Sequence, residues 1–156
     1  MTVARKLRDF LDEQHAPYAV LQHEEKFTSP EIAQSLHVPG REMAKVVIVQ
    51  ADGRLVMAVL PSDRYIDLTR FADATHAEMV GLATEEDFRR AFPDCEVGAM
   101  PPFGNLYGVE VLVDEALTRD TEIAFEAGNH HEAIRMTYRD YAELVQPKVA
   151  DFGQKA

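Results

Sequence analysis

The sequence predicts an α+β fold, in which a mixed, curled sheet of about seven or eight short strands is flanked by helices. Apolar, β-branched runs bounded by Gly, Pro, Asn and Asp are interspersed with amphipathic segments of helical spacing. The two kinds of segment do not alternate regularly, so the repeating strand–helix order of a parallel-sheet protein is not expected. No internal repeat, low-complexity tract or linker interrupts the chain. We therefore expect one domain spanning residues 1–156.

About four or five segments have helical signals. In residues 2–15, Leu7, Phe10 and Leu11 share one face, and Thr2 is a candidate N-cap. Residues 28–31 combine hydroxyl caps, a proline in the first turn and a glutamate three residues after the threonine, which predicts a helix that stops before Pro39. The other helical patterns cover residues 66–71, residues 84–91 and residues 137–144.

The clearest strand signal is a hairpin formed by residues 45–50 and 54–60 around Asp52-Gly53. Both runs are apolar on both faces, so they should lie centrally in the sheet and be covered on each side. Further strands are expected at residues 18–22, 76–80, 107–113, 122–127 and 131–136, with a turn at Gly128-Asn129.

The composition limits the classes of partner. The chain of 156 residues has 16 basic and 27 acidic side chains, a net charge of −11. Such a charge disfavours the binding of DNA and of most of an RNA, because phosphates would be repelled. A terminal nucleotide can still be held in a local pocket. No apolar run is long enough to span a membrane, and the N-terminus lacks the apolar region of a signal peptide. A single cysteine, Cys95, excludes an internal disulfide, which fits a reducing compartment, so we expect a cytoplasmic protein. From the net charge and the short apolar runs we expect neither a DNA partner nor a membrane partner.

One stretch is too apolar for an ordinary solvated loop. The sequence Gly98-Ala99-Met100-Pro101-Pro102-Phe103-Gly104 contains two glycines and two adjacent prolines, which exclude a helix interior or a central strand. A stiff loop of this kind suits the wall of a small-molecule pocket, since its glycines let a ligand approach the backbone. It also suits a buried structural turn, and composition alone favours the turn.

Lys45 stands where the most hydrophobic strand begins. There its ammonium could bind a phosphate or a developing oxyanion, or it could simply extend out of a buried strand into solvent. His130 and His131 are adjacent and should point to opposite faces of a strand, and no histidine has metal-ligand spacing. His131 could line a pocket after the Gly128 turn or lie on the surface. The chain lacks a nucleophile elbow and a glycine-rich nucleotide motif, so neither covalent catalysis nor a metal or other cofactor is expected.

Lys45, the 98–104 loop, and the tail from residues 123–128 to residues 140–144 together resemble the YbaK family, which is related to the editing domain of bacterial prolyl-tRNA synthetase. The resemblance implies a barrel-like mixed sheet and hydrolysis of the ester that joins a wrong amino acid to the terminal adenosine of a tRNA. It also implies that Lys45 holds this adenosine and its phosphate, while residues 98–104 and Gly128 contact the substrate. Some relatives have a catalytic histidine after the glycine turn, and His131 falls near that place. In this family a ribose hydroxyl of the substrate is thought to help activate water.

These features predict a trans-acting deacylase for a small mischarged residue of alanine, serine or cysteine size. Met100 and Phe103 are expected to set the volume of its pocket. The expected partners are the acceptor end of a tRNA and an aminoacyl-tRNA synthetase. The alternatives are a non-catalytic module of the same fold that binds a nucleotide or a synthetase, and a hydrolase of another small acyl ester.

Overall fold

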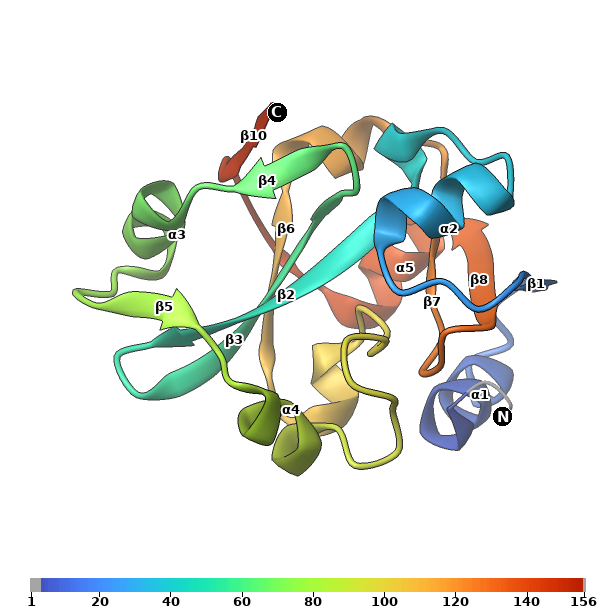
Figure 1. Ribbon diagram of the computed structural model, residues 1–156, viewed down its shortest axis with the longest axis horizontal. Coiled ribbons are helices and arrows are strands. Elements are labelled where there is room, and N and C mark those ends of the chain that lie inside the picture. The colour runs from blue at the N-terminus through green and yellow to red at the C-terminus, as the bar shows by residue number, and fades with distance from the viewer. Residues whose placement is uncertain (1–3, 156) are drawn as a thin grey trace.

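The computed structural model describes residues 4–155 and confirms the α+β prediction (Figure 1). Five α-helices occur in these residues: α1 (Arg5–Glu13), α2 (Ser29–Ser35), α3 (Leu68–Thr75), α4 (Glu85–Ala91) and α5 (Tyr138–Val145). Three short 3₁₀ helices accompany them: η1 (Gly40–Glu42), η2 (Gly104–Tyr107) and η3 (Glu115–Arg119). No helix in this part of the chain has the length and apolar character needed to cross a bilayer.

Ten strands form three sheets within residues 4–155. The largest has the order β5-β2-β3-β6-β9 and contains β2 (Ala44–Ala51), β3 (Arg54–Pro61), β5 (Val80–Leu82), β6 (Glu110–Asp114) and β9 (Lys148–Ala150). The second has the order β1-β8-β7 and contains β1 (Ala19–Gln22), β7 (Glu122–Glu126) and β8 (Glu132–Thr137). A third pairs β4 (Arg64–Ile66) with β10 (Gly153–Lys155).

The helix starts follow from local chemistry. Thr28, Thr84 and Thr137 each accept a hydrogen bond from the backbone N–H three residues ahead, and Asp67 does the same for α3. Helix α1 instead begins at Arg5, after Ala4 and without a side-chain cap. The predicted cap Thr2 lies outside the described residues.

The central hairpin forms as predicted. Strands β2 and β3 pair antiparallel from Ala44↔Pro61 to Ala51↔Arg54, and Asp52 and Gly53 have φ angles of 49° and 85° in the turn. Strands β3, β6 and β9 pair in parallel, which makes the sheet mixed. A single parallel bridge, Met43↔Ala124, joins the start of β2 to β7, but the sheets of the described residues do not close into a barrel.

The sequence analysis expected fewer strands and placed some boundaries wrongly. Strands β4, β9 and β10 are three residues long and pair with distant segments, so their sequences contain too little pattern to reveal them. The strand expected at residues 76–80 lies at Val80–Leu82. The strand expected from residue 107 starts at Glu110, because residues 104–107 form a 3₁₀ turn.

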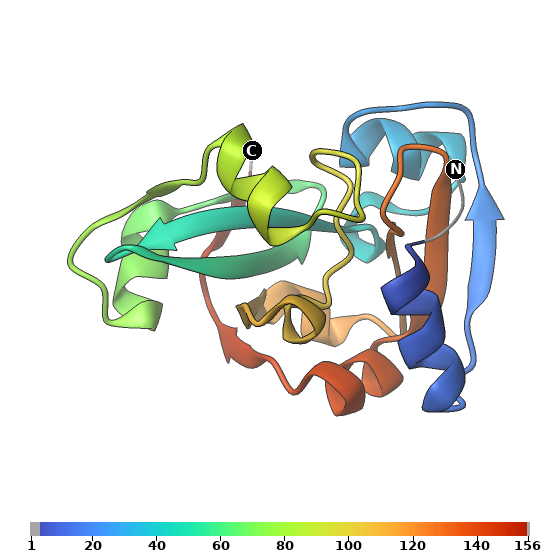
Figure 2. The ribbon, with the colours of Figure 1, turned by 90° about the horizontal axis from the view of Figure 1, so that it is seen from below.

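Both faces of the central hairpin are covered, as its two-sided apolar pattern predicted (Figure 2). Ala44 and Ile48 of β2 pack into a core that contains Phe103 and Phe125. Val49 and Ala51 pack into a second core with Phe71 and Phe152, under α3. A smaller third cluster joins α2 to residues 38–43 and to Ala124 of β7.

Gly104 ends the proline-containing loop where the backbone folds back on itself. Its carbonyl accepts a hydrogen bond from Val109 N at 2.9 Å. A Cβ atom at this position would lie 2.6 Å from the Val109 carbonyl oxygen and 2.8 Å from Cγ2 of Val111. The backbone oxygen cannot move aside without breaking the start of β6, so only glycine fits.

We therefore expect Gly104→Ala to lower the free energy of unfolding by about 2–4 kcal/mol, a typical cost for a clash in a packed core. Urea denaturation followed by circular dichroism measures this change. Gly81→Ala is the matched control, because a Cβ there meets no atom within 4 Å, and a cost below about 0.5 kcal/mol is expected. Equal costs for the two variants would contradict this explanation.

Candidate active site

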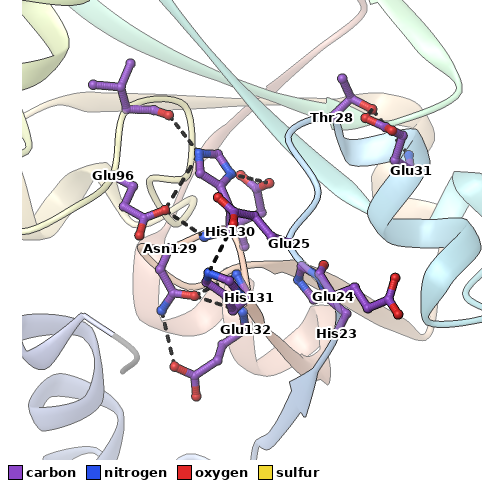
Figure 3. A network of polar contacts seen from close by, with 12 residues as sticks. His23, Glu24, Glu25, Thr28, Glu31, Glu96, Asn129, His130, His131 and Glu132 are labelled. Carbon is purple, nitrogen blue, oxygen red and sulfur yellow. Dashed lines mark hydrogen bonds and ion pairs between the residues drawn. The ribbon is translucent and has the colours of Figure 1, made fainter. Parts of the chain in front are cut away.

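The turn between β7 and β8 is held together by the side chain of Asn129 (Figure 3). Asn129 Oδ1 accepts hydrogen bonds from the backbone N–H groups of His131 (2.8 Å) and Glu132 (2.9 Å), and its Nδ2 donates to Glu132 Oε1 at 3.2 Å. Gly128 precedes it with a φ of +104°, and a Cβ there would lie 2.8 Å from Cβ of Ala4. The turn therefore needs both the glycine and the amide side chain at these positions.

The 98–104 loop is attached to this turn by two backbone hydrogen bonds. Glu96 N donates to the Gly128 carbonyl at 2.8 Å, and Gly128 N donates to the Ala99 carbonyl at 2.8 Å. At the far end of the loop, the buried Tyr141 hydroxyl donates to the Pro102 carbonyl at 2.7 Å. The loop is therefore fixed at both ends, and the predicted substrate residues Gly98 and Gly128 become neighbours.

His130 occupies the junction of the turn, the loop and the segment before α2. Its Nε2 lies 3.0 Å from the Val97 carbonyl, and its backbone N–H donates to Glu96 Oε2 at 3.1 Å. Its Nδ1 lies 3.7 Å from Glu126 Oε1, and its ring centroid lies 4.9 Å from that of Phe27. His130 is buried, whereas Phe27 is 65% exposed beside it.

The two buried ionisable groups of this junction affect each other. Glu126 raises the pKa of His130 because a nearby carboxylate stabilises the protonated ring. Burial raises the pKa of the Glu126 carboxyl, and His130 opposes that effect. The carboxylate therefore favours the protonated ring, while burial favours the neutral form of Glu126.

Lys45 lies beside a cleft of about 510 Å³ between α2 and residues 62–65. Its Nζ is 5.1 Å from the centroid of the Tyr65 ring, a cation–π contact. Burial lowers the pKa of the Lys45 ammonium, and the Asp63 carboxylate opposes this shift. The lining of the cleft is partly apolar and partly polar: Pro30, Ala33, Gln34, Val38, Gly40, Ser62, Asp63 and Tyr65.

The structure does not form the expected pocket walled by Lys45 on one side and by Met100 and Phe103 on the other. Lys45 pairs with Leu60, and directly opposed residues of antiparallel strands share a face. Leu60 belongs to the core under α3, whereas Met100 and Phe103 pack with Ala44 in the other core. Met100 and Phe103 are at most 2% exposed, so their side chains fill the interior of the protein.

Residues 27–34 connect the cleft to the His130 junction. Phe27 contacts the His130 ring, and Pro30, Ala33 and Gln34 line the cleft beside Lys45. Lys45 thus lies beside the cleft at one end of residues 27–34, and the exposed Gly98 lies beside the His130 junction at the other end. A ligand that extends along this segment could reach both.

The other predicted residues have different environments. His131 is exposed and lies 3.9 Å from Glu25 on the surface, so the histidine that adjoins Gly98 is His130. Ala99, Pro101 and Pro102 are buried. Within residues 4–155, no group of three or more His, Cys, Asp or Glu side chains is arranged to hold a metal ion.

Sequence reasoning missed Glu96, Glu126 and Phe27. Glu96 is 34 residues from His130, and nothing in the local pattern connects the two. Glu126 ends an apolar run that has a glutamate at each end, so it resembled an exposed strand end. It is buried in the structure, where it faces the His130 ring.

Comparison with known proteins identifies the class to which this fold and site belong. The family model of the aminoacyl-tRNA editing domain matches residues 23–144, and the chain belongs to this family, as the resemblance predicted. This stretch contains Lys45, the 98–104 loop and the turn at Gly128.

Particular relatives support the same assignment. The chain is 25% identical over 157 residues to the multifunctional Ser/Thr-tRNA deacylase ProXp-y of Escherichia coli, covering 97% of this chain and 93% of that protein. It is 30% identical over 106 residues to the proline–tRNA ligase of Bacillus subtilis, covering 67% of this chain but 19% of the ligase. The fold is also similar to a crystal structure described as a candidate trans-editing enzyme for prolyl-tRNA synthetase, with a TM-score of 0.84, 20% identity, and coverage of 97% of this chain and 96% of that one.

Tyr141→Phe should loosen the far end of the loop, because it leaves the buried Pro102 carbonyl without its hydrogen bond. We expect the free energy of unfolding to fall by about 1–3 kcal/mol. We also expect faster amide exchange at Gly128, whose N–H donates to the loop. Tyr18→Phe is the control, because its hydroxyl bonds Asp12 on the surface and its loss should cost less than about 1 kcal/mol. Unchanged stability in Tyr141→Phe would show that this bond does not hold the loop.

Proposed function

We propose that this protein is a trans-acting aminoacyl-tRNA deacylase that hydrolyses the ester of a small mischarged amino acid, with residues 1–156 forming one editing domain. The observation that carries the proposal is the family match over residues 23–144, together with the deacylase relative that aligns along nearly the whole chain. A tRNA substrate would place its activity in the cytoplasm. A synthetase partner fits the similarity to part of a proline–tRNA ligase.

The terminal adenosine of the tRNA is proposed to lie in the cleft beside Lys45. Tyr65 offers an exposed aromatic ring, and the Lys45 ammonium lies over that ring in position to bind a phosphate or a ribose oxygen. Partial burial strengthens the attraction between the ammonium and a bound anion, because fewer water molecules screen it, although the same burial lowers the pKa of the ammonium. The volume of about 510 Å³ falls within the ordinary range for small-ligand sites.

The aminoacyl group is proposed to extend along residues 27–34 toward Gly98 and the His130 junction. Gly98 is exposed and has no side chain, so the ester can approach the backbone there. An aminoacyl ester is already activated, and orienting it together with one water molecule can accelerate its hydrolysis substantially. Such a mechanism requires neither an enzyme nucleophile nor a metal.

This arrangement changes the expected origin of size selection. Met100 and Phe103 lie in the core and support the loop from below, and Met100 also lines a hollow of only about 10 Å³ beside Gly98. The exposed side chains at the surface end are Phe27 and Val97. We propose that these two side chains limit the size of the amino acid that can enter.

The proposal is tested with a panel of tRNAs carrying alanine, serine, threonine or cysteine, measuring release of the amino acid by the purified protein. We expect release from at least one of them. Lys45→Ala should reduce kcat/KM by about 100-fold or more, the usual cost of losing a fixed charge in such a site.

Lys155→Ala is the matched control, because this lysine is exposed on β10 and should leave kcat/KM unchanged. Binding of a tRNA without release of any amino acid would instead favour the non-catalytic module. Release that is insensitive to Lys45→Ala would overturn the proposed adenosine site.

A further inference from the structure

We propose that His130 is held as an imidazolium cation that clamps Val97 and Gly98 onto the β7–β8 turn, and that Glu126 is the positioning residue that maintains this state. The inference concerns the same site and its use in catalysis rests on the proposed function, but the protonation state of the ring can be measured independently. His130 would then serve as a fixed charge beneath the loop, not as a general base.

The groups around the ring are hydrogen-bond acceptors (Figure 3). Nε2 lies 3.0 Å from the Val97 carbonyl and 3.9 Å from Glu96 Oε2. Nδ1 lies 3.7 Å from Glu126 Oε1, and within residues 4–155 neither of these two buried atoms has a hydrogen-bond partner. A carbonyl can only accept, so Nε2 must carry a proton.

The proton on Nε2 decides what happens at Nδ1. In a neutral ring with Nε2 protonated, Nδ1 presents a lone pair to the Glu126 carboxylate, and two acceptors would face each other inside the protein. A proton on either Nδ1 or the Glu126 carboxyl would remove this conflict. In the proposed state Nδ1 carries it, because the ring then lies as a cation between two carboxylates, Glu126 and Glu96. The direction of the His130 pKa, which is raised by Glu126, agrees with this geometry.

Among residues 4–155, no basic side chain contributes to the shift of the His130 pKa. The neighbouring segment before α2 contributes Phe27, whose ring faces His130, and the backbone N–H of Lys26, which donates to the His130 carbonyl at 3.3 Å. The Lys26 ammonium lies 3.9 Å from Glu24, its ion-pair partner. From the loop and from β7, the charged groups that face the ring are the carboxylates of Glu96 and Glu126.

The clamp fixes the part of the loop that the substrate is proposed to approach. His130 contacts Val97 through its ring and Glu96 through its backbone, and a Cβ at Gly98 would lie 4.0 Å from Cε1 of the ring. Its contribution is lost as the pH rises through the raised pKa of His130 in the folded protein. On the acid side it is lost as the pH falls through the raised pKa of Glu126, where the facing carboxylate is neutralised. Loop order should therefore decrease on the alkaline side.

The direct test is an NMR titration of the His130 ring, assigned by comparison with His130→Gln. In the wild-type protein we expect a pKa above 6.5. In Glu126→Gln we expect this pKa to fall, since the facing charge is gone. Glu25→Gln is the control: this carboxylate faces the exposed His131, and its loss should leave the His130 titration unchanged.

A wild-type pKa at or below 6.5 would overturn the proposal without any need for a variant to fold. Equal shifts of the His130 pKa in Glu126→Gln and Glu25→Gln would show a general charge effect and would equally overturn the role of Glu126.

The deacylation assay distinguishes a positioning role from a catalytic one. We expect Glu126→Gln to raise KM by about 3- to 10-fold with kcat within about 2-fold of wild type, because the loop binds substrate less well. A fall in kcat at unchanged KM, with a rate that follows the His130 pKa, would identify a general base and overturn the clamp. If no aminoacyl-tRNA is hydrolysed but His130 titrates as expected, the clamp stands and the proposed function fails.

Discussion

The organisation of this site depends on two backbone hydrogen bonds between Glu96–Ala99 and Gly128. They join the loop that follows α4 to the turn between β7 and β8 of the three-stranded sheet. Because Gly128 packs against Ala4, the same turn also receives the start of the first helix, whose Ala4 N–H donates to the Ala127 carbonyl. Three parts of the chain therefore meet at one glycine, where a side chain would keep them apart.

The charges at this junction differ in character from those of the surface. The helices carry exposed ion pairs, such as Arg89–Glu85 and Arg90–Glu86, which contribute little to stability because water screens them. His130 and Glu126 are instead both buried. Their interaction is stronger for that reason, and removing either partner would leave the other uncompensated. Lys45 and the His130 ring, which lies between the carboxylates of Glu96 and Glu126, are basic groups at the two places where we propose that the substrate lies.

The sequence also led to one wrong expectation about how the pocket is built. It predicted that the proline-containing loop would face the ligand with its large side chains, Met100 and Phe103. These side chains anchor the loop in the core, and what the loop exposes is the glycine at its beginning. The two alternatives considered for this stretch, a buried turn and a pocket wall, are therefore compatible. Met100 and Phe103 bury their side chains as a structural turn does, while the exposed Gly98 can contact a ligand.

The sequence by itself determined whatever depends on neighbouring residues: the threonine and aspartate caps, the Asp52-Gly53 hairpin, the two-sided apolar strands and the family to which the chain belongs. Only the tertiary structure decided which histidine adjoins the loop, because the choice between His130 and His131 depends on the turn that Asn129 imposes. It also decided that Glu126 is buried and that Glu96 contacts a residue 34 positions away. Such contacts form when distant segments pack together, and no local pattern encodes them.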